Sequence, residues 1–135
     1  MDTGEIAREI YAYTDGYPFL VSRLCKIIDE KLDKDWTIGG VRAAVEIILE
    51  ENNTLFDDLI KNIENNPELY DFVYSMLMRG VKFPFNVNDP IMRLGAMYGF
   101  FKKRNRMVAI SNKIFEILIT EYFVSIEMRN QYRYY

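Results

Sequence analysis

The chain has 135 residues, of which 50% are apolar, 15% aromatic and 27% charged, a composition typical of a globular domain and unlike that of disordered chains. The absence of histidine excludes Ser-His-Asp and Cys-His nucleophiles and His-ligated metal sites within these residues. The net charge of −3 is unevenly divided, because residues 1–66 carry 7 basic and 14 acidic side chains, whereas residues 67–135 carry 10 and 6. This asymmetry suggests two parts with different neighbours.

In the N-terminal half, helical periodicity predicts three helices. Asp2 and Glu5 form a capping-box pattern before a helix over 3–14, and Pro18 suits the first turn of a second helix that reaches Lys34. Thr37 is expected to cap a third helix, and Asn52 and Asn53 are expected to end it.

The C-terminal half changes pattern after two more helices, predicted over 54–64 and 67–79, with Gly80 as a C-cap glycine. A short extended piece over 82–85 precedes a helix that starts at Asp89-Pro90. Residues 100–103 and 107–110 read as a β-hairpin around Arg104-Asn105. Ser111 is expected to cap the last helix. The side chains expected to face inward on the last two helices are Ile91, Leu94, Met97, Ile114, Phe115, Leu118, Ile119, Tyr122 and Ile126.

The fold class expected is therefore mainly α: a helical, lid-type bundle followed by a winged-helix domain with a small β-hairpin wing. The best internal boundaries lie near Asn52-Asn53 or Asn65-Asn66, and we place the helical unit at 1–53 and the winged-helix unit at 54–135. No apolar run approaches the ~18 residues that a membrane span needs, and the acidic start of the chain does not resemble a signal peptide. Single Cys25, which excludes an intrachain disulfide, is expected to be a buried thiol, so we expect a cytoplasmic chain without a membrane partner.

Four cations gather at the predicted wing, namely Lys102, Lys103, Arg104 and Arg106. Such a cluster can contact the phosphates of nucleic acid, and it is also typical of a solvated turn that discourages edge pairing. The helix before the wing carries one cation, Arg93, which is few donors for reading base edges. A free-standing DNA-binding winged-helix protein is the alternative function that this cluster suggests.

Other patterns do not indicate catalysis. The adjacent carboxylates Asp57 and Asp58, like Glu50 and Glu51, do not face one another on a helix, and the acidic run over 29–35 lacks the spacing of a calcium loop. No glycine-rich phosphate loop is present. We therefore expect no enzyme activity, no metal and no cofactor in this chain itself. The aromatics Tyr11, Trp36, Tyr132, Tyr134 and Tyr135, with Arg129 and Arg133, suggest an interaction module or, for the last residues, a frayed terminus.

The most distinctive local pattern is Thr14-Asp15-Gly16-Tyr17-Pro18-Phe19-Leu20, followed by Val21-Ser22-Arg23-Leu24. By itself it is a helix–turn–helix junction. It resembles the Gly-x-Pro segment in the helical lid of AAA-like and STAND-type ATPases. The segments 67–80, 94–99 and 110–116 look like the first winged-helix helix, the helix-to-wing junction and the wing exit of the same proteins.

The resemblance implies that the chain is the C-terminal region of a bacterial AAA-like ATPase without its nucleotide-binding core. Gly16, Tyr17 and Pro18 would then contact ATP or ADP in the parent protein, with a hinge near Asp15-Gly16, and Arg23 is a candidate sensor of the γ-phosphate. The implied partner is the upstream ATPase core of the parent chain, with another protein or a second copy as further partners. The implied function is regulatory: the lid would couple the nucleotide state to the winged helix.

Overall fold

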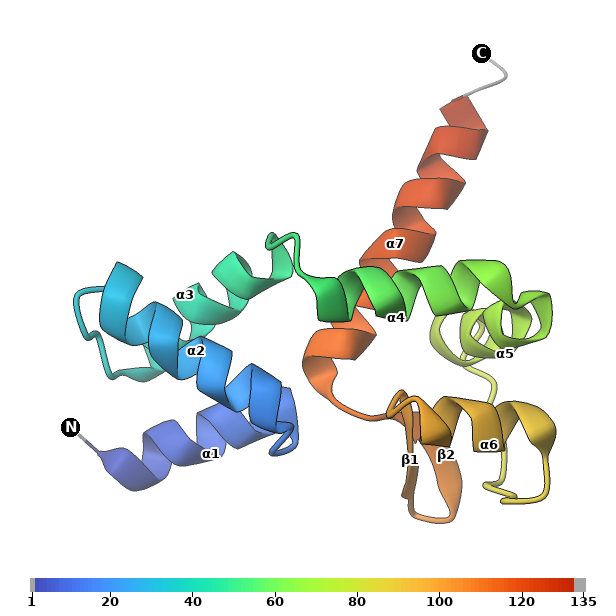
Figure 1. Cartoon of the computed structure of the whole chain (residues 1–135), viewed down its shortest axis with the longest axis horizontal. Coiled ribbons are helices and arrows are strands. Elements are labelled where there is room, and N and C mark those ends of the chain that lie inside the picture. Colours follow the sequence, from blue (N-terminus) through green and yellow to red (C-terminus); the bar gives the residue numbers. More distant parts are fainter. Residues whose placement is uncertain (1, 133–135) are drawn as a thin grey trace. The chain divides into compact units, whose positions relative to one another are not determined.

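The computed structural model describes residues 2–132 and is mainly helical, with one small antiparallel hairpin, which confirms the predicted fold class at that level (Figure 1). The chain divides into two compact units. The N-terminal unit extends to Asn52 and also includes Asn112–Ile114, whereas the C-terminal unit comprises Asn53–Ser111 and the chain from Phe115 on. None of the described helices combines the length and the apolar composition that crossing a bilayer requires.

The N-terminal unit contains α1 (Thr3–Thr14), α2 (Pro18–Lys31) and α3 (Ile38–Leu49). Two predicted caps are present: the Asp2 carboxylate accepts from the N–H of Glu5 (3.1 Å), and the Thr37 hydroxyl accepts from the N–H of Gly40 (3.1 Å). The apolar stripes of the three helices form the core of the unit, whose fully or nearly fully buried members include Ile6, Ile10, Leu20, Leu24, Ile27, Ile28, Val41, Ala44, Val45 and Ile48.

The predicted end of α2 at Lys34 is wrong, because the helix ends at Lys31. Asp33 and Lys34 adopt the left-handed conformation, with φ of 51° and 58°. The N–H of Lys34 donates to the C=O of Ile28 (3.0 Å), a bond that closes the helix end without the usual glycine. Apolar periodicity continues to Leu32, so the sequence pattern alone extended the predicted helix into the turn.

The C-terminal unit begins with α4 (Thr54–Asn65) and α5 (Pro67–Met78), capped by Asn53 and Asn66. A short helix, α6 (Pro90–Met97), leads into β1 (Phe101–Arg104) and β2 (Met107–Ile110), and α7 (Lys113–Tyr132) follows. The hairpin turn lies one residue later than predicted, at Asn105 and Arg106, whose φ values of 50° and 67° match the two-residue turns that suit twisted hairpins.

The extended piece before α6 joins the hairpin through an isolated bridge between Pro84 and Met107. The N–H of Val108 donates to the C=O of Phe83 (2.9 Å), and the N–H of Phe85 donates to the C=O of Arg106 (2.9 Å). Phe72 of α5 packs against Phe83, with ring centroids 4.4 Å apart. This aromatic contact holds the extended piece, and through it the hairpin, on α5.

The start and the buried face of α7 differ from prediction. The helix begins at Lys113, so Ser111 is not its cap; instead its hydroxyl donates to the C=O of Gly99. Phe123 is fully buried, whereas Tyr122 and Ile126, which were expected to be buried, are only half-buried. The apolar face of α7 therefore includes a residue that the periodicity did not indicate.

Phe123 lies at the centre of a cluster of aromatic rings, with its centroid 5.0 Å from Tyr70 and 5.3 Å from Tyr74, both edge-to-face. Two phenols of the cluster donate to carboxylates: Tyr122 to Glu64 (2.8 Å) and Tyr74 to Glu127. Burial, and then the hydrogen bond to Glu64, raise the pKa of Tyr122 well above its ordinary value. The pKa of Tyr74 is also raised, first by its hydrogen bond to Glu127.

These shifts predict a loss of stability in alkaline solution. A tyrosine whose pKa is higher in the folded than in the unfolded chain binds its proton more tightly when folded, so its contribution is complete below the unfolded pKa of about 10 and is lost as the pH rises above it. We expect Tyr122→Phe to reduce the fall in the free energy of unfolding between pH 8 and 11, measured by urea denaturation. Tyr132→Phe, which alters an exposed phenol, is the matched control; an alkaline limb unchanged by Tyr122→Phe would contradict the prediction.

Candidate functional site

The first candidate site is the turn between α1 and α2, which contains Gly16, Tyr17 and Pro18. Gly16 has a φ of 77°, Tyr17 is extended, and Pro18 is the first residue of α2, as its fixed φ favours. The buried hydroxyl of Thr14 organises the turn, because it donates to the C=O of Ile10 (2.8 Å) and accepts from the N–H of Gly16 (3.2 Å). The predicted junction is thus a turn closed by its own hydrogen bonds.

An apolar hollow of about 250 Å³ adjoins this turn. Its walls come from α1, the turn and α2, namely Ala7, Ile10, Tyr11, Thr14, Gly16 and Val21. The ring of Tyr11 lies against Gly16, since a Cβ added to Gly16 would fall 3.5 Å from a ring carbon. Tyr11 is nevertheless 60% exposed, so the hollow offers an accessible aromatic wall to a ligand.

Arg23, the candidate phosphate sensor, is held by a carboxylate of its own unit. Its Nε lies 2.9 Å and 3.1 Å from the two carboxylate oxygens of Glu51, and its Nη2 also contacts that carboxylate. This hydrogen bond is the main cause of the raised pKa of Arg23. A contact with a phosphate would require Arg23 to leave a bidentate partner, which costs more than using a free cation.

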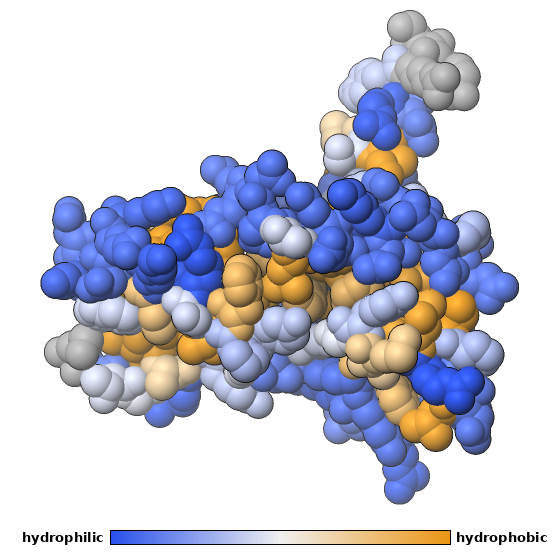
Figure 2. All heavy atoms as spheres, in the orientation of Figure 1, coloured by the Kyte–Doolittle hydropathy of each residue, from blue (hydrophilic) through white to orange (hydrophobic). Residues whose placement is uncertain are grey.

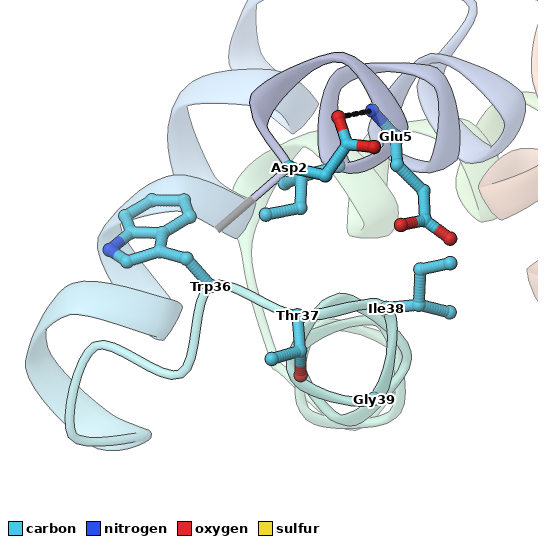
Figure 3. Close-up of a pocket in the computed structure, with 7 residues that line it drawn as sticks. Asp2, Glu5, Trp36, Thr37, Ile38 and Gly39 are labelled. Atoms are coloured by element: carbon cyan, nitrogen blue, oxygen red, sulfur yellow. Dashed lines mark hydrogen bonds between the residues drawn. The ribbon is translucent and has the colours of Figure 1, made fainter.

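A second hollow of the N-terminal unit, of about 340 Å³, was not predicted from the sequence. Figure 3 shows Trp36 on one side of it and Ile38 on the other, with Asp2, the N-cap of α1, and Glu5 of its first turn above them. Neither carboxylate forms an ion pair in the part of the chain that the structure describes. The only sequence signal was the single tryptophan directly before the helix cap at Thr37.

The second candidate site is the hairpin with its four cations. Lys102, Lys103 and Arg104 belong to β1, and Arg106 lies in the turn. Lys102 is half-exposed and the other three are exposed. Phe101 and Val108, which lie on the other side of the hairpin from Lys102, are buried. The structure therefore brings the four predicted cations together on one protruding element.

The helix before the hairpin presents an apolar rather than a polar outer face. Met97 was expected to point inward but is 73% exposed, and Met92 and Gly95 are the buried residues of α6. The reason is the close approach of α6 to β1: a Cβ added at Gly95 would fall 2.2 Å from the ring of Phe101. Gly95 marks the contact face, and Met97, two positions on, points away from it.

The remaining candidates are the acidic residues, Cys25 and the C-terminal aromatic residues. Among residues 2–132, no group of three or more cysteine and carboxylate side chains is placed to hold a metal ion. Cys25 is half-buried rather than buried, and desolvation raises the pKa of its thiol, which makes it less reactive. Tyr132 is exposed, whereas Arg133, Tyr134 and Tyr135 lie outside the described residues.

Comparison with protein-family models, with curated proteins and with solved structures found no match for this chain.

Proposed function

We propose that this chain is a regulatory lid and winged-helix region of an AAA-like ATPase, with no catalytic activity of its own. The observation that carries the proposal is the apolar hollow beside Gly16, with the exposed ring of Tyr11 as one wall. It adjoins the segment Gly16-Tyr17-Pro18 on which the resemblance rests.

The hollow has the chemistry that a nucleotide base requires. A planar base gains from stacking on an aromatic ring and from removing apolar surface from water, here that of Val21 and Ala7. Gly16 keeps this approach open, because a side chain at its positive φ would be strained and would narrow the entrance. In this proposal the phosphates and the magnesium ion are held by the ATPase core of the parent, and the lid contributes contacts to the base.

Such contacts would make the lid sensitive to nucleotide state. A lid that binds the base in one state gains contact energy there alone, and only such differential binding can shift a conformational equilibrium. The turn at Asp15-Gly16 is the proposed hinge, and the winged-helix unit is the proposed output. Arg23 has no part in the proposal, because Glu51 already holds it.

The first test is to determine the sequence of the gene upstream of this chain. A phosphate-binding loop is expected in the reading frame upstream of the codon for Asp2, and its absence from the intact gene would overturn the proposal. The second test measures the affinity of the intact gene product for ADP. Tyr11→Ala is expected to weaken ADP binding by about tenfold, which corresponds to ~1.4 kcal/mol of lost contact energy.

The matched control is Tyr132→Ala, which removes an equally exposed phenol from the C-terminal unit and should leave the affinity for ADP unchanged. Thermal unfolding followed by Trp36 fluorescence checks that Tyr11→Ala leaves the N-terminal unit folded. If the folded variant binds ADP as the wild type does, the hollow is not a base site.

A further inference from the structure

The sequence between Arg79 and Arg106 has a concentration of positive charge that the proposed lid function does not use. It contains seven lysines and arginines and a single carboxylate, Asp89. That carboxylate is already engaged, because it caps α6 by accepting from the N–H groups of Ile91 (2.9 Å) and Met92 (3.1 Å). The segment therefore carries a large local excess of positive charge.

Strand pairing places two of these cations on one face of the hairpin, and a third lies nearby. Lys102 pairs with Ala109 and Arg104 with Met107, and an isolated bridge joins Pro84 to Met107. Because alternate residues of a strand share a face, Lys102 and Arg104 lie on one face of the hairpin. Lys82, two residues before Pro84, lines the same hollow as Ala109.

The tip of the hairpin extends this positive surface. Lys103, Arg104 and Arg106 are exposed there together with Asn105. Within the described chain, none of Lys82, Lys103, Arg104 and Arg106 forms an ion pair with a carboxylate. Figure 2 shows a hydrophilic projection at the bottom of the view, where Figure 1 places the hairpin.

One carboxylate lies close to the sheet. Glu116 of α7 and Lys82 line the same shallow hollow, of about 240 Å³, beside Ala109. Glu116 lowers the positive potential at that end of the sheet, so the strongest attraction for an anion is expected at the tip, around Arg104.

The neighbouring helix indicates what kind of anion fits. An α-helix that reads DNA bases presents side-chain donors and acceptors to them, whereas the exposed positions of α6 are Pro90, Arg93, Ala96 and Met97. This face offers a single donor group. Contacts to phosphates require only cations, and arginine and lysine supply them without regard to sequence.

We propose that the cationic surface of the hairpin, formed by Lys102 and Arg104 on one face, Lys103 and Arg106 at the tip and the neighbouring Lys82, binds the phosphate backbone of duplex nucleic acid without reading its sequence. This inference is independent of the proposed lid function, because it uses other residues in the other unit. Duplex DNA is favoured over an acidic protein surface because it carries one charge per ~1.7 Å of its axis and releases condensed counterions when cations replace them.

The test is a fluorescence-anisotropy titration of the whole chain against two 20-base-pair duplexes of unrelated sequence, over a range of potassium chloride concentrations. Phosphate contacts from all five cations predict a slope of about −4.5 in a plot of log affinity against log salt. The two duplexes are expected to bind with equal affinity. The double variant Lys103→Gln/Arg104→Gln should weaken both alike and reduce the slope by about 1.8.

Two single variants serve as controls. Glu116→Gln is expected to strengthen binding, because it removes a negative charge from the hollow that Lys82 lines. Lys61→Gln removes the same charge as a hairpin variant but from α4, where the sequence neighbours are Asp57, Asp58 and Glu64, and should leave the slope unchanged.

The proposal is overturned if no duplex binds at 20 mM salt, if the two sequences differ more than tenfold, or if Lys61→Gln weakens binding as much as a hairpin variant. Displacement of DNA by an equal charge concentration of polyglutamate would instead assign the surface to an acidic protein partner. Circular dichroism shows whether each variant keeps its helices.

Discussion

Replacing Gly40 with alanine is expected to destabilise the N-terminal unit by about 3 kcal/mol, the upper end of the usual cost of overpacking. Gly40 is buried in the first turn of α3, and a Cβ at this position would fall 1.8 Å from the backbone carbonyl oxygen of Asp35. A backbone atom cannot move aside as the end of a side chain can, so the loop before α3 would have to shift. The free energy of unfolding, from urea denaturation followed by Trp36 fluorescence, measures the effect.

The adjacent glycine provides the control for Gly40→Ala. Gly39 is exposed, and the nearest atom to an added Cβ outside its own helix backbone is the hydroxyl of Thr37, at 3.6 Å. Alanine favours helix over glycine by up to about 1 kcal/mol, so Gly39→Ala should be neutral or stabilising. Equal effects of the two substitutions would show that the close approach of Asp35 does not determine stability.

Replacing Phe123 with alanine is expected to destabilise the C-terminal unit by about 3–5 kcal/mol, the usual cost of removing a buried phenylalanine. Phe123 is fully buried and contacts two tyrosine rings edge-to-face, so its loss removes apolar burial and two aromatic contacts. Near-ultraviolet circular dichroism of the tyrosines, followed through urea denaturation, reports on this unit.

Val124 is the matched control for Phe123, because it is the next residue of the same helix and is partly exposed. Val124→Ala should change the free energy of unfolding by less than about 0.5 kcal/mol. A small effect of Phe123→Ala, comparable to that of the control, would mean that the aromatic cluster repacks without cost.

The features that were predicted correctly are local in origin. The caps at Asp2 and Thr37 follow from a short polar side chain that reaches an N–H group three residues on, and the predicted helix start at Asp89-Pro90 has the same origin. The hairpin follows similarly from two short strands around a turn. Each is determined by neighbours in the sequence, so the sequence is sufficient to find it.

The errors arise where contacts with another segment of the chain determine the partner or the orientation of a side chain. Ser111 resembled a cap, but its hydroxyl is taken by the C=O of Gly99 across the hairpin. Met97 lies on the apolar pattern of its helix, but the contact of Gly95 with Phe101 turns it outward. Neither partner is evident from local periodicity.

The same division applies to the candidate sites. Gly16 and Pro18 were singled out by the family resemblance and the hairpin cations by their clustering in the sequence, and their functional roles stay predictions. The role of Tyr11 as the wall of a hollow depends on how α1 and α2 pack, and periodicity assigns it only to the outer side of its helix. The hollow beside Trp36 likewise requires the start of α1 to lie next to the start of α3 (Figure 3).

The N-terminal unit is built from two separate segments of the chain, and this has a consequence for its synthesis on the ribosome. Its buried residues Asn112 and Ile114 are translated sixty residues after Asn52, and the ammonium of Lys113, between them, lies over the ring of Tyr13, 5.1 Å from its centroid. At about 5–20 residues per second, the first three helices wait roughly 3–12 s for this segment. During that interval Ile114 is not yet present to join the buried residues of the unit, and apolar surface exposed during folding favours aggregation, which chaperones counteract.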